Sequence, residues 1–224
     1  MGQTTRRLPS HLVARAVWAL LGVAVLGLGS SVLRAAQVGV DPFTAANIGV
    51  SARLGMDLGT YQLLVNAVLL LPMLAWGRRY IGLGTVINMV MTGFFVQWFS
   101  ALLVPLVPDP PHHLLQTVLF VVGILLFTAG ASAYMTAGIG TAPYDALAPI
   151  VVDRTGARYR VVRVVQDLAF VGLAVLFGGP VGVGTVMTAF FAGPLIDFFN
   201  RRVSAPLLER VLPDRDGAAV SDSR

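Results

Sequence analysis

The hydrophobic positions of this chain fall into long runs, separated by short segments that carry most of the polar and charged side chains. A helix needs about 20 predominantly apolar residues to cross the hydrocarbon layer of a bilayer. Windows of that length with charges only near their ends predict six membrane-spanning helices. The six windows are 16–36, 58–76, 81–104, 114–136, 160–177 and 181–199.

Two further segments, 37–57 and 137–159, are too polar and too short to be full spans. Each opens with glycines and a proline, continues with helix-compatible residues and ends in Arg-x-Gly. A proline at the first position is typical of a helix start, and Gly55 and Gly156 are typical of helix ends. We predict that each segment forms a short helix lying in the membrane or dipping part-way into it.

These two segments also belong to an internal repeat. Residues 38–43 align with 139–144, and residues 82–86 align with 182–186 after a slip of one position. Each copy holds an odd number of predicted crossings, so the second copy enters the membrane from the opposite face. The repeat is therefore predicted to be inverted, as in secondary transporters whose broken segments meet near the midplane.

The motifs of the repeat resemble those of a known family. The Gly-x-x-Pro-(Phe/Tyr) element after the first helix of each half, and the Gly-x-Gly-Thr-Val start of the third, are similar to the YczE/YitT group of bacterial membrane proteins. The resemblance covers about residues 12–202. It is closer to the YczE branch, because the additional soluble C-terminal domain of YitT-like proteins is missing. It implies a polytopic plasma membrane protein and supports an architecture more than a reaction.

The composition agrees with a membrane protein. Hydrophobic residues make up 56% of the 224 residues and charged ones only 12%, against about 25% charged in a soluble domain. With no cysteine, a disulfide scaffold, a thiolate zinc site and a cysteine nucleophile are excluded. We expect an all-α, polytopic transmembrane helix bundle of about six spans. Its expected regions are a cytoplasmic N-terminus (1–11), a first membrane repeat (12–104), an outer loop (105–113), a second repeat (114–202) and a cytoplasmic tail opening with an interfacial turn (203–224).

The basic residues mark topology. All 16 are arginines, and the net charge is +5. With the N-terminus inside, the outer segments hold only Arg34 and Arg53, and every other arginine falls in an inner segment. This bias follows the positive-inside rule and predicts that both termini are cytoplasmic. Short arginine clusters between apolar runs also argue against a nucleic-acid-binding stripe.

Aspartates in the two short segments are candidates for a site. Asp41 immediately precedes Pro42, and Asp145 follows Pro143 by two positions. Charged groups at membrane depth are costly and usually have a partner or line a pathway. One hypothesis is that these four residues flank a central cavity where the carboxylates bind a cation or relay a proton. The alternative, which needs only local geometry and is favoured, is that the aspartates cap their helices.

A second candidate pair lies in the fifth predicted span. Arg163 and Asp167 are four residues apart on one helical face and are able to pair. Their counterparts in the first repeat, Gln62 and Asn66, are neutral but still polar. One hypothesis is a transport site lined by Asn66, Arg163 and Asp167, with Asp167 as the titrating group. The alternative, equally weighted, is that Arg163 snorkels to the interface and Asp167 merely neutralises it.

Two further polar residues are weaker candidates for site lining. Asn88 lies in the third predicted span, and Tyr144 lies beside Pro143 in the second short segment. A single Asn or Tyr in a membrane helix more often makes a hydrogen bond between helices. Tyr144, beside Pro143, is included in the candidate site.

Metal and enzyme chemistry find little support. His112 and His113 stand near Asp109, but adjacent histidines point in different directions and further ligands are absent, so an interfacial loop is favoured. Neither a His-Glu-x-x-His nor a Gly-x-Ser-x-Gly pattern occurs. We therefore expect a protein that is not an enzyme and that has no cofactor.

The leading hypothesis is a small secondary transporter or permease with a midplane site between inverted repeats. The alternative is a non-transporting scaffold or accessory protein of an envelope or biosynthetic pathway. A transporter predicts that the two Gly-x-x-Pro segments meet at a polar cavity deep in the membrane. A scaffold predicts that they lie flat above a dry, sealed bundle. The expected partners are the lipid bilayer and a small solute or ion, and the sequence leaves a homo-oligomer open.

Overall fold

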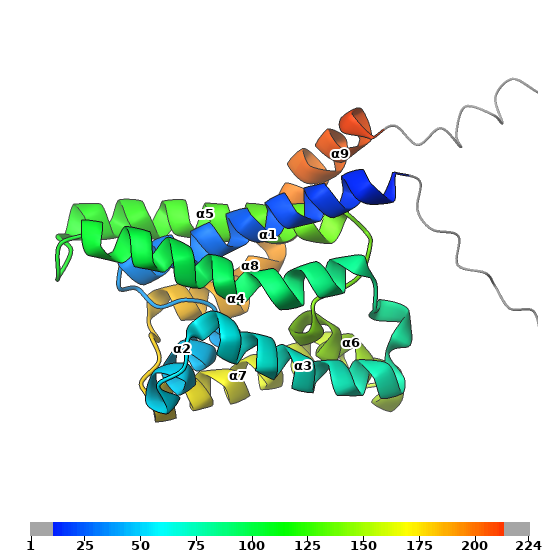
Figure 1. Ribbon diagram of the computed structural model, residues 1–224, viewed down its shortest axis with the longest axis horizontal. Helices are drawn as coiled ribbons and strands as arrows, with labels where there is room; N and C mark the ends of the chain where they lie inside the picture. Colours follow the sequence, from blue (N-terminus) through cyan, green and yellow to red (C-terminus); the bar gives the residue numbers. More distant parts are fainter. Residues whose placement is uncertain (1–10, 213–224) are drawn as a thin grey trace, which may run out of the picture.

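The structure is a computed structural model that describes residues 11–212, and every regular element in this part of the chain is a helix. The long helices run along the long axis of the molecule (Figure 1). In chain order the elements are α1 (Leu12–Ala35), α2 (Pro42–Leu54), α3 (Leu58–Trp76), η1 (Arg78–Tyr80), α4 (Leu83–Leu103), η2 (Val104–Leu106), α5 (His113–Thr136), α6 (Pro143–Thr155), α7 (Tyr159–Phe177), α8 (Val183–Phe199), η3 (Asn200–Ser204) and α9 (Ala205–Val211).

Five helical segments of the described chain are long and apolar enough to cross a membrane. They are Leu12–Ala35, Leu58–Trp76, Leu83–Leu106, His113–Thr136 and Val183–Val211. The sixth predicted window forms α7, which has 19 residues like α3. It carries three charged residues, Arg160, Arg163 and Asp167, whereas each of the five segments has an apolar stretch of 18 residues with at most two. Five predicted crossings are thus matched by apolar helices, and a crossing by α7 stays a prediction.

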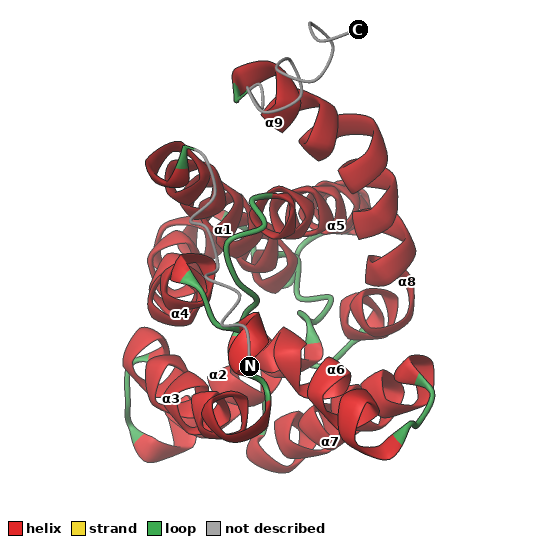
Figure 2. Cartoon of the chain, turned by 90° about the vertical axis from the view of Figure 1, so that its right-hand side faces the viewer, coloured by secondary structure: helices red, strands yellow, loops and turns green. Residues whose placement is uncertain are grey.

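The two short segments form helices inside the bundle. Both α2 and α6 have 13 residues and begin with a proline, whose missing N–H costs no hydrogen bond at that position. They end at Gly55 and Gly156, which adopt φ of 65° and 68°, a conformation that glycine tolerates without strain. These helix boundaries confirm the prediction from the sequence. Seen along the long axis, α2 and α6 lie in the middle of the bundle (Figure 2).

Helix α2 is buried on all sides rather than on one face. Its residues from Pro42 to Gly49 are buried without interruption. A helix buried all round is characteristic of a protein interior. The helix therefore does not lie flat on a surface of the bundle.

Helices α1 and α5 pack backbone against backbone through two pairs of glycines. A Cβ built on Gly22 would lie 2.4 Å from the backbone N of Tyr134, and one built on Gly29 would lie 2.3 Å from that of Phe127. From α5, a Cβ on Gly130 would lie 2.2 Å from the backbone N of Leu26, and one on Gly123 would lie 2.7 Å from the side chain of Leu33. Small residues of this kind are what membrane helices use to pack closely.

The second half of the chain repeats the element lengths of the first. Helices α1 and α5 have 24 residues each, α2 and α6 have 13, and α3 and α7 have 19. Each half also donates a backbone hydrogen bond to the other. Gly84 N–H, at the start of α4, donates to Ile139 O at 2.9 Å, and Gly184 N–H, at the start of α8, donates to Val38 O at 2.7 Å.

The end of the membrane part differs from the expectation. Instead of a turn from residue 203, the chain continues from α8 through the π-helical segment Asn200–Ser204 into α9. The Ser132 hydroxyl donates to the Ser204 hydroxyl at 2.8 Å, which ties this segment to α5. The predicted interfacial turn was therefore wrong. The rest of the expected tail, 213–224, and residues 1–10 lie outside the described residues.

Candidate functional site

The first turns of the two short helices meet at an aromatic contact. Phe43 of α2 stacks on Tyr144 of α6 with 4.6 Å between the ring centroids. Phe170 of α7 packs edge-on against both rings, at 5.4 and 5.1 Å. Pro42 and Pro143, which were candidate site residues, are buried and begin the two helices. The two Gly-x-x-Pro segments, far apart in the sequence, thus come together.

Next to this contact, an arginine joins two carboxylates. Arg163 Nη1 donates to Asp145 Oδ1 at 3.1 Å, and Arg163 Nε lies 3.3 Å from Asp167 Oδ1. The Tyr144 hydroxyl donates to the same Asp167 oxygen, and the guanidinium lies over the Tyr144 ring, 4.8 Å from its centroid. The residue at the N-cap of α6 is Ala142. Asp145 is therefore a partner of Arg163 and not the N-cap of its helix.

The predicted pairing of Arg163 with Asp167 within α7 is present, and it also involves a second helix, α6. Asp167 is only 4% exposed, while the side chains of Arg163 and Asp145 keep 29% and 24% of their surface. An arginine that only snorkelled to the interface would have its guanidinium in water rather than against α6. Arg163 therefore does not only snorkel to the interface, since Asp145 and Tyr144 of α6 contact the charged pair of α7.

Asp41 has the capping role that the sequence favoured. Its Oδ1 accepts a hydrogen bond from the backbone N–H of Thr44 at 3.0 Å, and the Ser30 hydroxyl donates to its Oδ2 at 3.4 Å. Phe43, two residues after Asp41, stacks on Tyr144, whose hydroxyl donates to Asp167, so the start of α2 lies beside the Arg163 contacts. The residues named here, where α2, α6 and α7 meet, thus include three carboxyl groups, of Asp41, Asp145 and Asp167, and one guanidinium, of Arg163.

The counterparts of the charged pair lie in a separate polar patch between α3 and α4. Gln62 and Asn66 are each 1% exposed, and Asn88 of α4 is 7% exposed. Asn66 Nδ2 donates to the Met89 carbonyl at 3.3 Å, while Gln62 Oε1 is buried without a hydrogen-bond partner. Asn66, a predicted site residue, thus bonds to α4 rather than to the Arg163 cluster.

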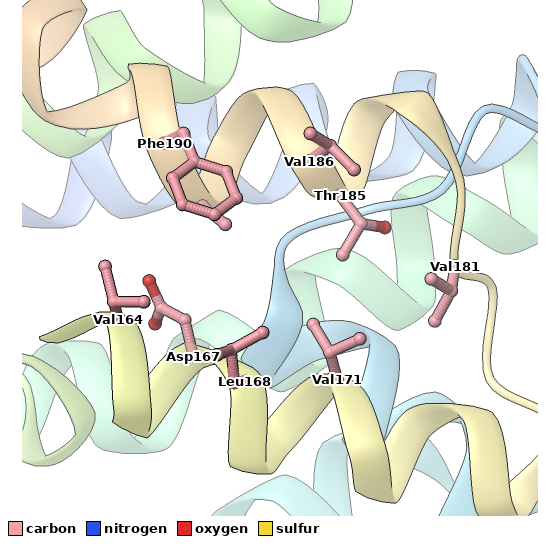
Figure 3. Close-up of a pocket in the computed structure, with 9 residues that line it drawn as sticks. Val164, Asp167, Leu168, Val171, Val181, Thr185, Val186 and Phe190 are labelled. Atoms are coloured by element: carbon pink, nitrogen blue, oxygen red, sulfur yellow. The ribbon is translucent and has the colours of Figure 1, made fainter.

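A groove with a volume of about 100 Å³ runs between α7 and α8 beside the charged cluster (Figure 3). Asp167 points into the space between the two helices, near Val164 and Phe190 (Figure 3). The residues that line the groove are Val164, Asp167, Leu168, Val171, Val181, Thr185, Val186, Ala189 and Phe190. Sequence reasoning missed the groove, because its apolar lining has the same composition as a lipid-facing surface.

The histidine pair and its neighbour have local structural roles. His112 Nδ1 accepts a hydrogen bond from the Leu115 N–H at 3.2 Å and so caps α5. Asp109 Oδ1 accepts one from Gln37 Nε2 at 3.0 Å, which joins the loop before α5 to the end of α1. These contacts suit the interfacial loop that the sequence favoured here.

Comparisons with known proteins agree with the resemblance seen in the motifs. Residues 13–201 match a family described as a family of unknown function, DUF6198. The chain is 26% identical over 189 residues to the uncharacterized membrane protein YczE of Bacillus subtilis, covering 84% of this chain and 86% of the relative. It is 29% identical over 183 residues to an uncharacterized protein of Haemophilus influenzae, covering 80% of each. No solved structure matches. The predicted YczE-like identity is confirmed, and the protein is an integral, multi-pass membrane protein.

Proposed function

This chain belongs to the family of unknown function DUF6198, and on that premise we propose that it is a small secondary transporter. It works by exposing a midplane site alternately to the two sides of a bacterial plasma membrane. The observation that carries the proposal is the meeting of α2 and α6 beside the partly buried contacts of Arg163 with Asp145 and Asp167. The protein is neither an enzyme nor dependent on a cofactor, and both of its termini are cytoplasmic.

The pairing of the two halves supports this proposal. Two inverted repeats with broken helices near the midplane are a recurrent design of secondary transporters. The equal lengths of α2 and α6, the burial of their first turns and the reciprocal hydrogen bonds of Gly84 and Gly184 suit such a pair of halves. In the scaffold hypothesis the two short helices would instead lie on the surfaces, and the burial of α2 argues against that arrangement.

The charges at the centre indicate a cationic cargo or a proton. Arg163 compensates one negative charge, whereas Asp41, Asp145 and Asp167 supply three when ionised. Excess charge in a medium of low dielectric constant is costly, and it is relieved by binding a cation or a proton. Asp167 is the group most suited to exchange, because it is buried and also lines the groove.

The test is a flux measurement on the full-length protein in liposomes. Proton gradients and gradients of Na⁺ or K⁺ are imposed across the membrane. Charge movement is recorded on a solid-supported membrane, and internal pH with a trapped dye. We expect cation or proton movement that Asp167→Asn abolishes. The matched control is Asp197→Asn, since Asp197 pairs with Arg201 four residues away in the same manner but is 60% exposed. The proposal fails if the wild type moves no charge or protons, or if both variants behave alike.

A further inference from the structure

The two equivalent helix pairs of this protein pack differently. Between α3 and α4, the Gly59 N–H donates to Gln97 Oε1 at 2.8 Å, and a Cβ on Gly93 would lie 2.9 Å from the Cβ of Gln62. At the corresponding place on α8, nothing lies within 4 Å of a Cβ built on Gly193. Helices α3 and α4 are closed against each other, whereas α7 and α8 stand apart around the groove (Figure 3).

The difference has a cause in the sequence. Gly59 lies against the ring of Phe94, and a Cβ at that position would come within 2.4 Å of the ring. The corresponding position on α7 is Arg160, and the counterpart of Phe94 is Pro194. An arginine does not allow the close approach that glycine permits. The groove is therefore a feature of the second half and not a gap common to both.

The groove is apolar except at two positions. Of its nine lining residues, seven are Val, Leu, Ala or Phe, and the polar ones are Thr185 and Asp167. The Thr185 hydroxyl already accepts a hydrogen bond from the Gly182 N–H at 3.2 Å. At the rim, Leu168 is 57% and Phe190 52% exposed. In a bilayer this rim faces acyl chains, so a ligand that reaches the groove through it has an apolar part.

We propose that the groove binds the apolar part of a small lipophilic amine in its ammonium form, whose charged head pairs with Asp167. Charge complementarity supports a cationic head group. One guanidinium, that of Arg163, is shared between the carboxylates of Asp145 and Asp167, so one negative charge is left for the ligand to neutralise. Size agrees with it. A cavity of about 150 Å³ holds the six carbons of benzene, so in proportion a groove of about 100 Å³ holds about four carbons, and a longer chain extends past the exposed rim. That this amine is the transported substrate rests on the proposed function. That it binds in the groove does not.

The experiment compares two probes of similar shape, hexylammonium and the uncharged hexanol. Their binding to the full-length protein in phosphatidylcholine nanodiscs is measured by calorimetry, with empty nanodiscs subtracted. A charge-assisted contact predicts that hexylammonium binds at least about tenfold more tightly than hexanol. Asp167→Asn is expected to remove this preference, and Asp167→Glu to retain it.

Two further variants test the location. Ala189→Phe fills the groove from α8 and is expected to abolish binding of both probes. The matched control is Val175→Phe, which adds the same ring on α7 at a position that is 64% exposed and does not line the groove. It is expected to leave both affinities unchanged. Size-exclusion profiles and thermal unfolding without ligand establish that each variant is folded.

Three results would overturn the inference. Equal affinities for hexanol and hexylammonium would mean an unspecific slot filled by lipid chains. Retention of the ammonium preference in Asp167→Asn, or of binding in Ala189→Phe, would place the ligand elsewhere. The binding assay needs no gradient, so ammonium binding without any flux refutes only the proposed transport. Flux of inorganic cations without ammonium binding refutes only this inference.

Discussion

Replacement of Gly130 by alanine tests the glycine contact between α1 and α5. The added Cβ would lie 2.2 Å from the backbone N of Leu26 and 2.7 Å from the carbonyl oxygen of Gly22. Both neighbours are backbone atoms of a helix, so neither has a side chain that is able to rotate away. The two helices must separate for the methyl group to fit.

The size of the effect follows from these distances. Non-bonded contacts are optimal at about 3.5 Å, so the helices must move apart by about 1 Å. Overpacking costs about 1–3 kcal/mol, and a clash with backbone atoms that cannot rotate away falls in the upper part of this range, at about 2–3 kcal/mol. The better helix propensity of alanine offsets up to about 1 kcal/mol. We expect a net loss of about 1–2 kcal/mol, which lowers the midpoint of thermal unfolding by about 2–8 °C for a chain of this size.

The assay is thermal unfolding in detergent of a fluorescent fusion, followed by size-exclusion chromatography. The matched control is Gly172→Ala on α7, where nothing lies within 4 Å of the added Cβ. That variant is expected to unfold at or slightly above the temperature of the wild type. If Gly130→Ala and Gly172→Ala unfold at the same temperature, α1 and α5 do not pack as closely as described, and the reasoning is refuted.

Three further predictions concern the other contacts. Arg163→Gln leaves two carboxylates without their cation and is expected to lower the free energy of unfolding by at least about 2 kcal/mol. The same change at Arg201, which is 76% exposed, is expected to cost less than about 1 kcal/mol. Urea or thermal unfolding of the two variants measures this difference. Asp41→Ala removes an N-cap and is expected to cost about 1 kcal/mol, while Asp41→Asn keeps most of it, and equal unfolding midpoints would contradict the cap. Gly93→Ala is expected to destabilise the protein and Gly193→Ala to leave it unchanged in the same assay, so equal effects would show that the two helix pairs pack alike.

Local signals in the sequence predicted the helices and their ends well. Pro42 and Pro143 begin the short helices, and Gly55 and Gly156 end them, because proline and glycine act through their own backbone. The cap by Asp41 was predictable for the same reason, since it needs only the next three residues. The interfacial turn expected after α8 failed, because polar composition does not distinguish a turn from a short helix that packs on α5.

The site could be predicted only in part. Spacing along one helix was enough to pair Arg163 with Asp167. The contact of Arg163 with Asp145 and the hydrogen bond from Tyr144 to Asp167 join residues of α6 and α7. Nothing in the local sequence distinguishes Asp145 as an ion-pair partner from Asp145 as a cap. That distinction depends on the angle at which the two helices meet.

Hydropathy, glycine and proline positions and the internal repeat were sufficient to predict an all-helical membrane protein with two short internal segments. Membrane insertion depends on the hydrophobicity of each segment, and helix ends depend on the residues next to them. Both can be read directly from the order of residues. Only the tertiary structure decided that α3 closes on α4 while α7 stands apart from α8. Packing between helices depends on how side chains from distant segments fit together. The effect of having Gly59 in one half and Arg160 in the other therefore depends on the residues of the facing helix.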